Sequence, residues 1–178
     1  PFLYEMVGKE RRVSAQKGIT MNVNVLRSES TGSVHIKSAD PAEPPAIRFN
    51  FLSTEHDRTG IVNVLRKGRE LMATSPLKDV TGNEIAPGAH LQSDADLLEW
   101  VRNNAETTYH PVGTCKMGND PRAVVDPELR VHGIAGLRIA DASIMPTLTS
   151  GNTNAPAIMI GEKCASMVLA AADVARAA

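Results

Sequence analysis

One histidine stands in a stretch of sequence that neither a helix nor a central strand would tolerate. In residues 108–118 (TYHPVGTCKMG), His110 is followed at once by Pro111, and two glycines come soon after. Proline favours an extended backbone at the residue before it, and Gly113 permits a tight reversal or a close backbone approach. Free imidazole takes up a proton at about pH 6.5. The stretch therefore predicts a stiff loop that presents one imidazole, either as a proton acceptor or as a structural histidine bonded within its loop.

Two polar motifs follow later in the chain. Residues 149–163 (TSGNTNAPAIMIGEK) place Asn152 and Asn154 immediately before a predicted helix. A helix N-terminus exposes N–H groups and the positive end of the helix dipole, so these carboxamides either cap the helix or face a ligand that carries negative charge. Asp141 ends a short predicted strand at 137–140, where it either caps a turn or presents a carboxylate at a sheet edge.

The sequence lacks the motifs of several other kinds of site. The five histidines have neither HxxxH nor HExxH spacing, and the two cysteines are not grouped with them, so we expect no metal site. The sequence contains no GxSxG nucleophile elbow and no GxGxxG dinucleotide fingerprint. Scattered basic residues and a net charge of -1 argue against a nucleic-acid partner. The two cysteines fit no disulfide framework, which favours a reducing compartment.

The elements that must position these residues predict a mixed α and β chain. Alternating apolar and polar residues predict strands at 19–27 and 32–41, which we expect to pair as an antiparallel hairpin. Helical spacing and capping residues predict helices at 54–73, at 97–106 and from about Pro156 onward. No apolar run approaches the roughly 20 residues that span a bilayer. The length and a hydrophobic content of 42% suit one domain, or two small lobes that share a core.

Taken in their fixed order, three motifs resemble the C-terminal signature of the glucose-methanol-choline (GMC) oxidoreductases, which are flavin-dependent alcohol dehydrogenases and oxidases. The motifs are YHPVGTCKMG, VVDPELRVHGIAGLRIADASIMP and SGNTNAPAIMIGEKCA, and the earlier GSVHIKSADPAEPPAIRFNFLS resembles strands of the family's substrate domain. The resemblance runs from about Gly32 to Met167 and is nearest to choline-dehydrogenase-like members. It implies an α+β fold: a substrate-binding lobe with an antiparallel or mixed sheet and flanking helices (1–108), then a catalytic loop and a return segment with a long helix (109–178) that complete an FAD-binding domain.

The same resemblance implies roles for individual residues. His110 aligns with the histidine that accepts the alcohol proton, and Asn152 with a second active-site position that is histidine or asparagine across the family. The implied reaction oxidises a primary alcohol to an aldehyde: a neutral imidazole takes the hydroxyl proton, FAD takes the hydride, and Asn152 stabilises the developing alkoxide. Five further positions are implied to lie against FAD: Pro111, Asp141, Ala142, Asn154 and Ala155.

The FAD fingerprint of this family is not among these residues. We therefore expect a C-terminal portion of a longer enzyme, with the N-terminal FAD-binding domain as its partner and with neither bound FAD nor activity by itself. An apolar surface is expected where that domain docks, above all on the last helix, with self-association as a consequence. Two alternatives stay open: a binding module that kept the fold without catalysis, and a lyase of the same family. The expected location is cytoplasmic, with peripheral membrane association as an alternative. The sequence identifies neither the alcohol nor the electron acceptor.

Overall fold

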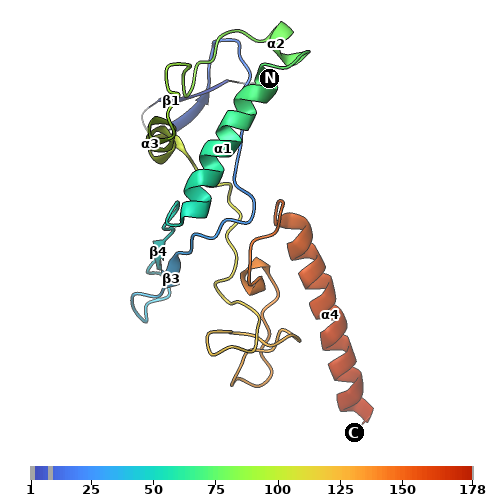
Figure 1. Cartoon of the computed structure of the whole chain (residues 1–178). Coiled ribbons are helices and arrows are strands. Elements are labelled where there is room, and N and C mark those ends of the chain that lie inside the picture. The colour runs from blue at the N-terminus through green and yellow to red at the C-terminus, as the bar shows by residue number, and fades with distance from the viewer. Residues whose placement is uncertain (1–2, 8–9, 178) are drawn as a thin grey trace. The chain divides into compact units, whose positions relative to one another are not determined.

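Helices make up most of the regular structure. The structure is a computed structural model that describes residues 3–7 and 10–177 (Figure 1). In chain order its elements are β1 (Tyr4–Val7), β2 (Glu10–Val13), β3 (Ser33–His35), β4 (Ala46–Arg48), α1 (Glu55–Met72), α2 (Leu77–Val80), α3 (Asp94–Asn104), the 3-10 helix η1 (Ala142–Ile144) and α4 (Asn154–Ala177). Among the described residues, the strands form two separate antiparallel pairs, β1–β2 and β3–β4. The mixed α and β character is confirmed, with less sheet than the sequence predicts.

The chain folds into two units, each with its own core. Unit 1 combines the described residues up to Val25 with Leu52–Glu106, and unit 2 combines Leu26–Phe51 with the residues from Thr107 on. The segment Leu26–Phe51 therefore belongs with the C-terminal part of the chain. The buried cluster of unit 1 consists of Val62, Leu65, Leu97 and Val101. That of unit 2 consists of Val125, Leu129, Ile144, Met145, Ile160 and Cys164.

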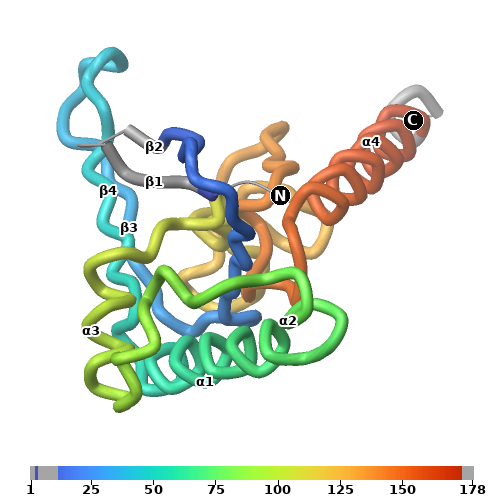
Figure 2. Tube along the Cα trace, turned by 90° about the horizontal axis from the view of Figure 1, so that it is seen from above, coloured from blue at the N-terminus to red at the C-terminus, as the bar shows by residue number. Residues whose placement is uncertain are grey.

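Unit 1 is built on α1 and α3, which contact each other (Figure 2). Each helix begins at a hydroxyl cap: the side chain of Thr54 accepts a hydrogen bond from the N–H of Asp57, and that of Ser93 accepts one from Asp96. Leu97 is fully buried between the helices, a burial that contributes about 1.5–3 kcal/mol. Both predicted helices are confirmed to within a few residues at each end.

An extended segment crosses α1 where a strand was predicted. Residues 19–27 contain no strand, so that prediction is wrong. Val23 and Val25 instead approach α1 at two of its glycines. A Cβ atom on Gly60 would lie 3.2 Å from Val25, and one on Gly68 would lie 3.2 Å from Val23. The alternation of apolar and polar residues is real, but it reflects a chain that is half-buried on a helix rather than in a sheet.

The hairpin of unit 2 pairs different segments from those predicted. β3 pairs with β4, in the register Ser33↔Arg48, Val34↔Ile47 and His35↔Ala46, so the predicted pairing of 19–27 with 32–41 is wrong. Residues 40–45 form the loop between the two strands, as their prolines predict. The chain is tightly packed at the start of β3, because a Cβ atom on Gly32 would lie 1.9 Å from the carbonyl oxygen of Arg48.

Residues 116–139 form a series of turns joined by single bridges. Residues 137–140 contain only the antiparallel bridge Arg130↔Arg138, so the predicted strand there is wrong. Gly133 and Gly136, both with positive φ, form turns in the segment between the two bridged residues. Partial burial acts to raise the pKa of Asp126, but hydrogen bonds from Arg130 outweigh it and hold that pKa below its usual range. This segment therefore supports the core of unit 2 through turns and polar contacts.

The last helix, α4, begins at Asn154, two residues before its predicted start. Ile160 and Cys164 pack into the core of unit 2. Apolar side chains elsewhere on the helix are exposed: Ile158, Met159, Val168 and Leu169. Over Asn154–Asp173 the helix has the length and composition of a membrane span, with a mean hydropathy of 1.3 and 11% of the stretch buried. The expectation that no apolar run approaches this length is therefore corrected, because the alanines between the larger residues keep the hydropathy high.

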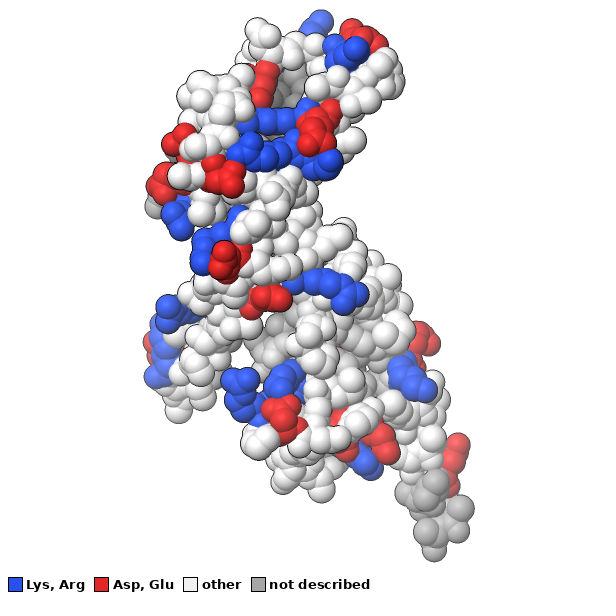
Figure 3. Space-filling model, in the orientation of Figure 1, with Lys and Arg blue, Asp and Glu red and all other residues white. Residues whose placement is uncertain are grey.

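Charges of both signs alternate over the face shown in Figure 3. Ion pairs join several of the described charged side chains. Arg69 bonds Glu84 at 3.0 Å and also donates to the carbonyl oxygens of Gly88 and Leu91, so one guanidinium fixes the loop that leads to α3. No stripe of one sign is visible on that face.

Candidate active site

The imidazole of His110 meets the start of α4. Its Nδ1 lies 2.9 Å from the side-chain oxygen of Thr153, a hydrogen bond between residues 43 positions apart in the chain. Thr153 is buried, at 8% exposure, and His110 is partly buried. Because Asn152 directly precedes Thr153, the fold brings the His110 loop to the segment that carries both asparagines. The structure thus gathers two of the three motifs at one place in unit 2.

The loop around His110 has an unusual backbone. Tyr109 has a φ of 61°, in the left-handed region, and its N–H donates to the side chain of Thr107 at 3.0 Å. For a non-glycine residue this conformation costs about 1–2 kcal/mol. Gly113 has a φ of 83°, and a Cβ atom there would lie 3.2 Å from the carbonyl oxygen of Met145. Of the two alternatives predicted for Gly113, the close backbone approach is confirmed, and His110 lies between Tyr109 and Gly113 in the chain.

Backbone hydrogen bonds join this loop to η1. The N–H of Cys115 donates to the carbonyl of Ser143 at 3.0 Å, and that of Met117 donates to Ile144 at 2.7 Å. Asp141 caps η1, since its side chain accepts a hydrogen bond from the N–H of Ser143 at 2.7 Å. Of the two roles that the sequence allows for Asp141, a cap or a carboxylate presented at a sheet edge, the structure shows the cap.

The other predicted positions occupy the same segments. Ala142 packs against the core of unit 2. Four of the positions lie at the surface: Pro111, Asn152, Asn154 and Ala155. The first turn of α4 carries no acidic residue. This region thus offers hydrogen-bond donors of three kinds: two carboxamides, one imidazole and the N–H groups of a helix N-terminus. Such a set of donors suits a bound group whose reacting part gains negative charge.

Two contacts of this region are not predicted by the sequence. Arg27, with a φ of 57°, donates from its Nε to the side chain of Ser150 at 2.6 Å and so anchors the segment before Asn152. Thr153 holds the imidazole, as described above. Nothing in the sequence around Arg27 indicates this contact, whereas the position of Thr153 between the two asparagines is a signal that was available in the sequence.

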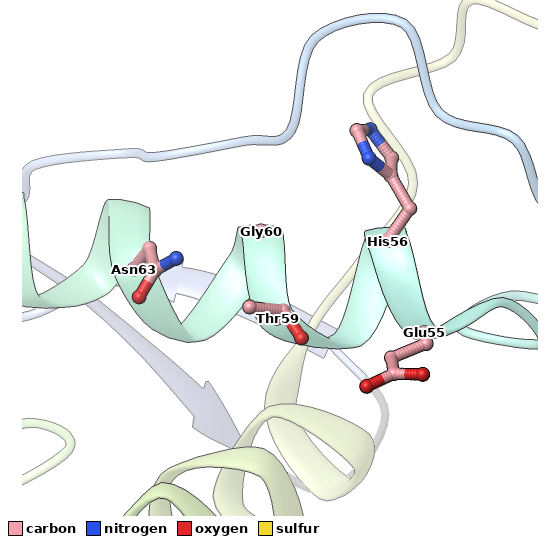
Figure 4. A pocket seen from close by; sticks show the side chains of 5 residues that line it. All are labelled: Glu55, His56, Thr59, Gly60 and Asn63. Atoms are coloured by element: carbon pink, nitrogen blue, oxygen red, sulfur yellow. The ribbon is translucent and has the colours of Figure 1, made fainter.

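A shallow hollow in unit 1 is a weaker candidate. Figure 4 shows its lining residues, which all come from one stretch of α1: Glu55, His56, Thr59, Gly60 and Asn63. The side chains of Glu55 and His56 project from opposite sides of the helix, so their polar groups do not converge (Figure 4). None of the motifs described above contributes to this hollow.

Comparisons with known proteins agree on one family. Residues 28–161 match the GMC oxidoreductase family in its C-terminal domain. Oxygen-dependent choline dehydrogenases of Escherichia coli and Klebsiella pneumoniae are each 52% identical over 153 residues, which is 86% of this chain and 28% of each relative. The chain thus spans little more than a quarter of the length of these relatives.

Solved structures give the same result. Pyridoxine 4-oxidase from Mesorbium loti superposes with a TM-score of 0.75 at 34% identity, covering 79% of this chain and 27% of that one. A formate oxidase from Aspergillus oryzae, studied for the modification of its FAD, gives a TM-score of 0.73 at 34% identity, covering 78% of this chain and 24% of that one. Both matches support the same fold for this chain.

Proposed function

The chain belongs to the GMC oxidoreductase family, and we propose that it is the substrate-binding and catalytic C-terminal part of a flavoenzyme that oxidises a primary alcohol to an aldehyde. Members of the family are FAD-dependent, and this chain is choline-dehydrogenase-like in sequence. The proposal concerns the complete protein, because the chain covers 28% of its relatives' length. The observation that carries it is the hydrogen bond between His110 Nδ1 and the side chain of Thr153, the residue that follows Asn152 at the start of α4.

His110 is assigned the proton transfer. Oxidising an alcohol removes a proton from oxygen and a hydride from carbon, and FAD, when bound, supplies the hydride acceptor. A partly buried neutral imidazole takes the hydroxyl proton, a role that accelerates such reactions by about 10²–10⁴. Asn152 donates a hydrogen bond to the substrate oxygen as negative charge develops on it.

The cofactor is assigned to the surface around the start of α4. Asn154 and Ala155 lie in the first turn of that helix, and Pro111 follows His110 directly. The helix N-terminus favours an electron-rich group by about 0.3–2 kcal/mol. Asp141 and Ala142 lie in the neighbouring segment and are assigned to the same cofactor. The adenosine part of FAD is assigned to the N-terminal domain of the complete protein.

The exposed apolar side chains of α4 are proposed to pack against that N-terminal domain in the cytoplasm. Leu169 is 67% exposed, while Ile160 of the same helix lies in the core. Leu169→Lys in the complete protein is expected to bury an unpaired charge and to lower stability by about 3 kcal/mol. The readout is the thermal midpoint together with retained FAD; a midpoint equal to that of the wild type would show that the surface faces solvent.

The activity is tested on the complete protein by anaerobic mixing with choline and with a panel of other primary alcohols. We expect the flavin absorbance to bleach and an aldehyde to form. A lyase releases product without bleaching, and a binding module does neither.

The assignment of the base is tested with two histidine variants. His110→Gln is expected to lower kcat/KM by about 10²–10⁴. His132→Gln is the matched control, because His132 lies in the same unit and also has one ring hydrogen bond, from Nε2 to the carbonyl of Gly118 at 3.1 Å. Equal losses in the two variants would refute the role of His110.

A further inference from the structure

We propose that Thr153 is the positioning residue that sets the tautomer and orientation of the His110 ring, by accepting a hydrogen bond from Nδ1–H. The inference rests on the proposed function, in which His110 is the base. Thr153 does not touch the reacting atoms in this scheme; it acts through the imidazole. The resemblance to the family implies roles for the asparagines on either side of Thr153 and none for Thr153 itself.

The hydroxyl of Thr153 is held rigidly. Its backbone carbonyl accepts the N–H of Ala157 at 2.9 Å, the first hydrogen bond of α4. Ile160 and Cys164 fix the following turns of the helix in the core of unit 2. A β-branched side chain such as threonine has few χ1 rotamers, and this one is 8% exposed. Its oxygen is therefore a fixed point for the ring, 2.9 Å from Nδ1.

The direction of the hydrogen bond decides what the ring can do. A neutral imidazole carries one N–H. When Nδ1–H donates to Thr153, Nε2 keeps its lone pair and is able to accept the substrate proton. When the hydroxyl donates to Nδ1 instead, Nε2 carries the hydrogen and cannot accept. Only the first arrangement is compatible with a base at Nε2, and its Nδ1–H···O bond stays intact after the proton is taken up.

The first test compares two substitutions at Thr153 in the complete, FAD-loaded protein. Thr153→Val keeps the shape and removes the hydroxyl, and we expect kcat to fall about tenfold with little change in KM. Thr153→Ser keeps the hydroxyl and should recover kcat to within about threefold. Thr81→Val is the matched control: Thr81 is partly buried and its hydroxyl donates to the carbonyl of Leu77 at 2.9 Å, far from His110 in the sequence.

The second test is ¹⁵N NMR of labelled histidine in the resting protein, with the His110 signals assigned from their loss in His110→Gln. We expect Nδ1 to be protonated and Nε2 unprotonated in the wild type, and a mixture of both tautomers in Thr153→Val. A wild-type ring protonated at Nε2 overturns the proposal, even where the valine variant fails to fold. Unchanged kcat and tautomer in Thr153→Val overturn it as well.

The two proposals fail in different ways. Full turnover in His110→Gln would show that His110 is not the base and would refute the proposed function. Loss of turnover in His110→Gln together with wild-type behaviour of Thr153→Val would support His110 as the base and refute only the role of Thr153.

Discussion

Replacing Gly113 with alanine tests how the loop after His110 is held. At a φ of 83°, an alanine takes on a left-handed strain of about 1–2 kcal/mol. Its Cβ atom would also lie 3.2 Å from the carbonyl oxygen of Met145, a crowded backbone contact that adds about 1 kcal/mol. Together the two effects should destabilise the closed conformation of the loop by about 2.5 kcal/mol.

Amide hydrogen exchange of the complete protein measures this quantity locally. The N–H groups of Cys115 and Met117 donate to η1, so their exchange reports the opening of the loop. An effect of about 2.5 kcal/mol accelerates their exchange about 60-fold, because about 1.4 kcal/mol corresponds to a factor of ten.

Gly133→Ala is the matched control. Gly133 has a φ of 77°, and a Cβ atom there meets nothing within 4 Å, so its substitution adds the strain without the contact. We expect exchange of the neighbouring amides to rise about tenfold. If Gly113→Ala and Gly133→Ala accelerate exchange equally, the close approach to Met145 contributes nothing. If Gly113→Ala has no effect, the loop is not held as described.

Three further changes test other parts of the chain. Leu97→Ala leaves a cavity at a fully buried position, which should cost about 2–5 kcal/mol, read from accelerated amide exchange in α1 and α3. A hydrogen bond from Lys116 lowers the pKa of the Asp120 carboxyl. The ionised carboxylate therefore stabilises the turn above about pH 4, and this stabilisation is lost as the pH falls through the lowered pKa. Asp120→Asn should remove this acid sensitivity, read from the pH dependence of amide exchange in the turn. Gly32→Ala should separate β3 from β4, because the new Cβ would lie 1.9 Å from the Arg48 carbonyl oxygen, and exchange in both strands should approach that of an open loop.

Two of these changes have a matched control, and the third has an outcome that would contradict it. Leu98→Ala alters the neighbouring, only partly buried leucine and should cost markedly less than Leu97→Ala. Gly82→Ala adds a Cβ that meets nothing within 4 Å and should leave amide exchange unchanged. Wild-type acid sensitivity in Asp120→Asn would show that the carboxylate contributes nothing to the turn.

Local signals in the sequence predicted the helices well. α1 and α3 were predicted because a hydroxyl cap and an apolar face of helical spacing occur together, and both properties depend on residues close in sequence. The strands were predicted poorly, because alternation shows that a segment is half-buried without showing what covers it. Val23 and Val25 lie against glycines of α1, and β3 pairs with a short segment after a proline-rich loop.

The site was predicted only in part for a similar reason. His110 and Asn152 stand out by residue type, and the resemblance to a family assigned them to one place. Their connection through Thr153 depends on a contact between residues 43 positions apart, which no local pattern reveals. The left-handed φ of Tyr109 likewise follows from the surrounding fold, since tyrosine has no preference for that region.

α4 links assembly to chemistry. Its first turn fixes Thr153 and so the His110 ring, while Val168 and Leu169, about four turns further on, are exposed. Between these two ends, Ile160 and Cys164 anchor the helix in the core of unit 2, so the start of α4 is held before anything packs on the uncovered end. A flavoprotein built in this way would carry its proposed proton acceptor in place before the remaining surface of the helix is covered.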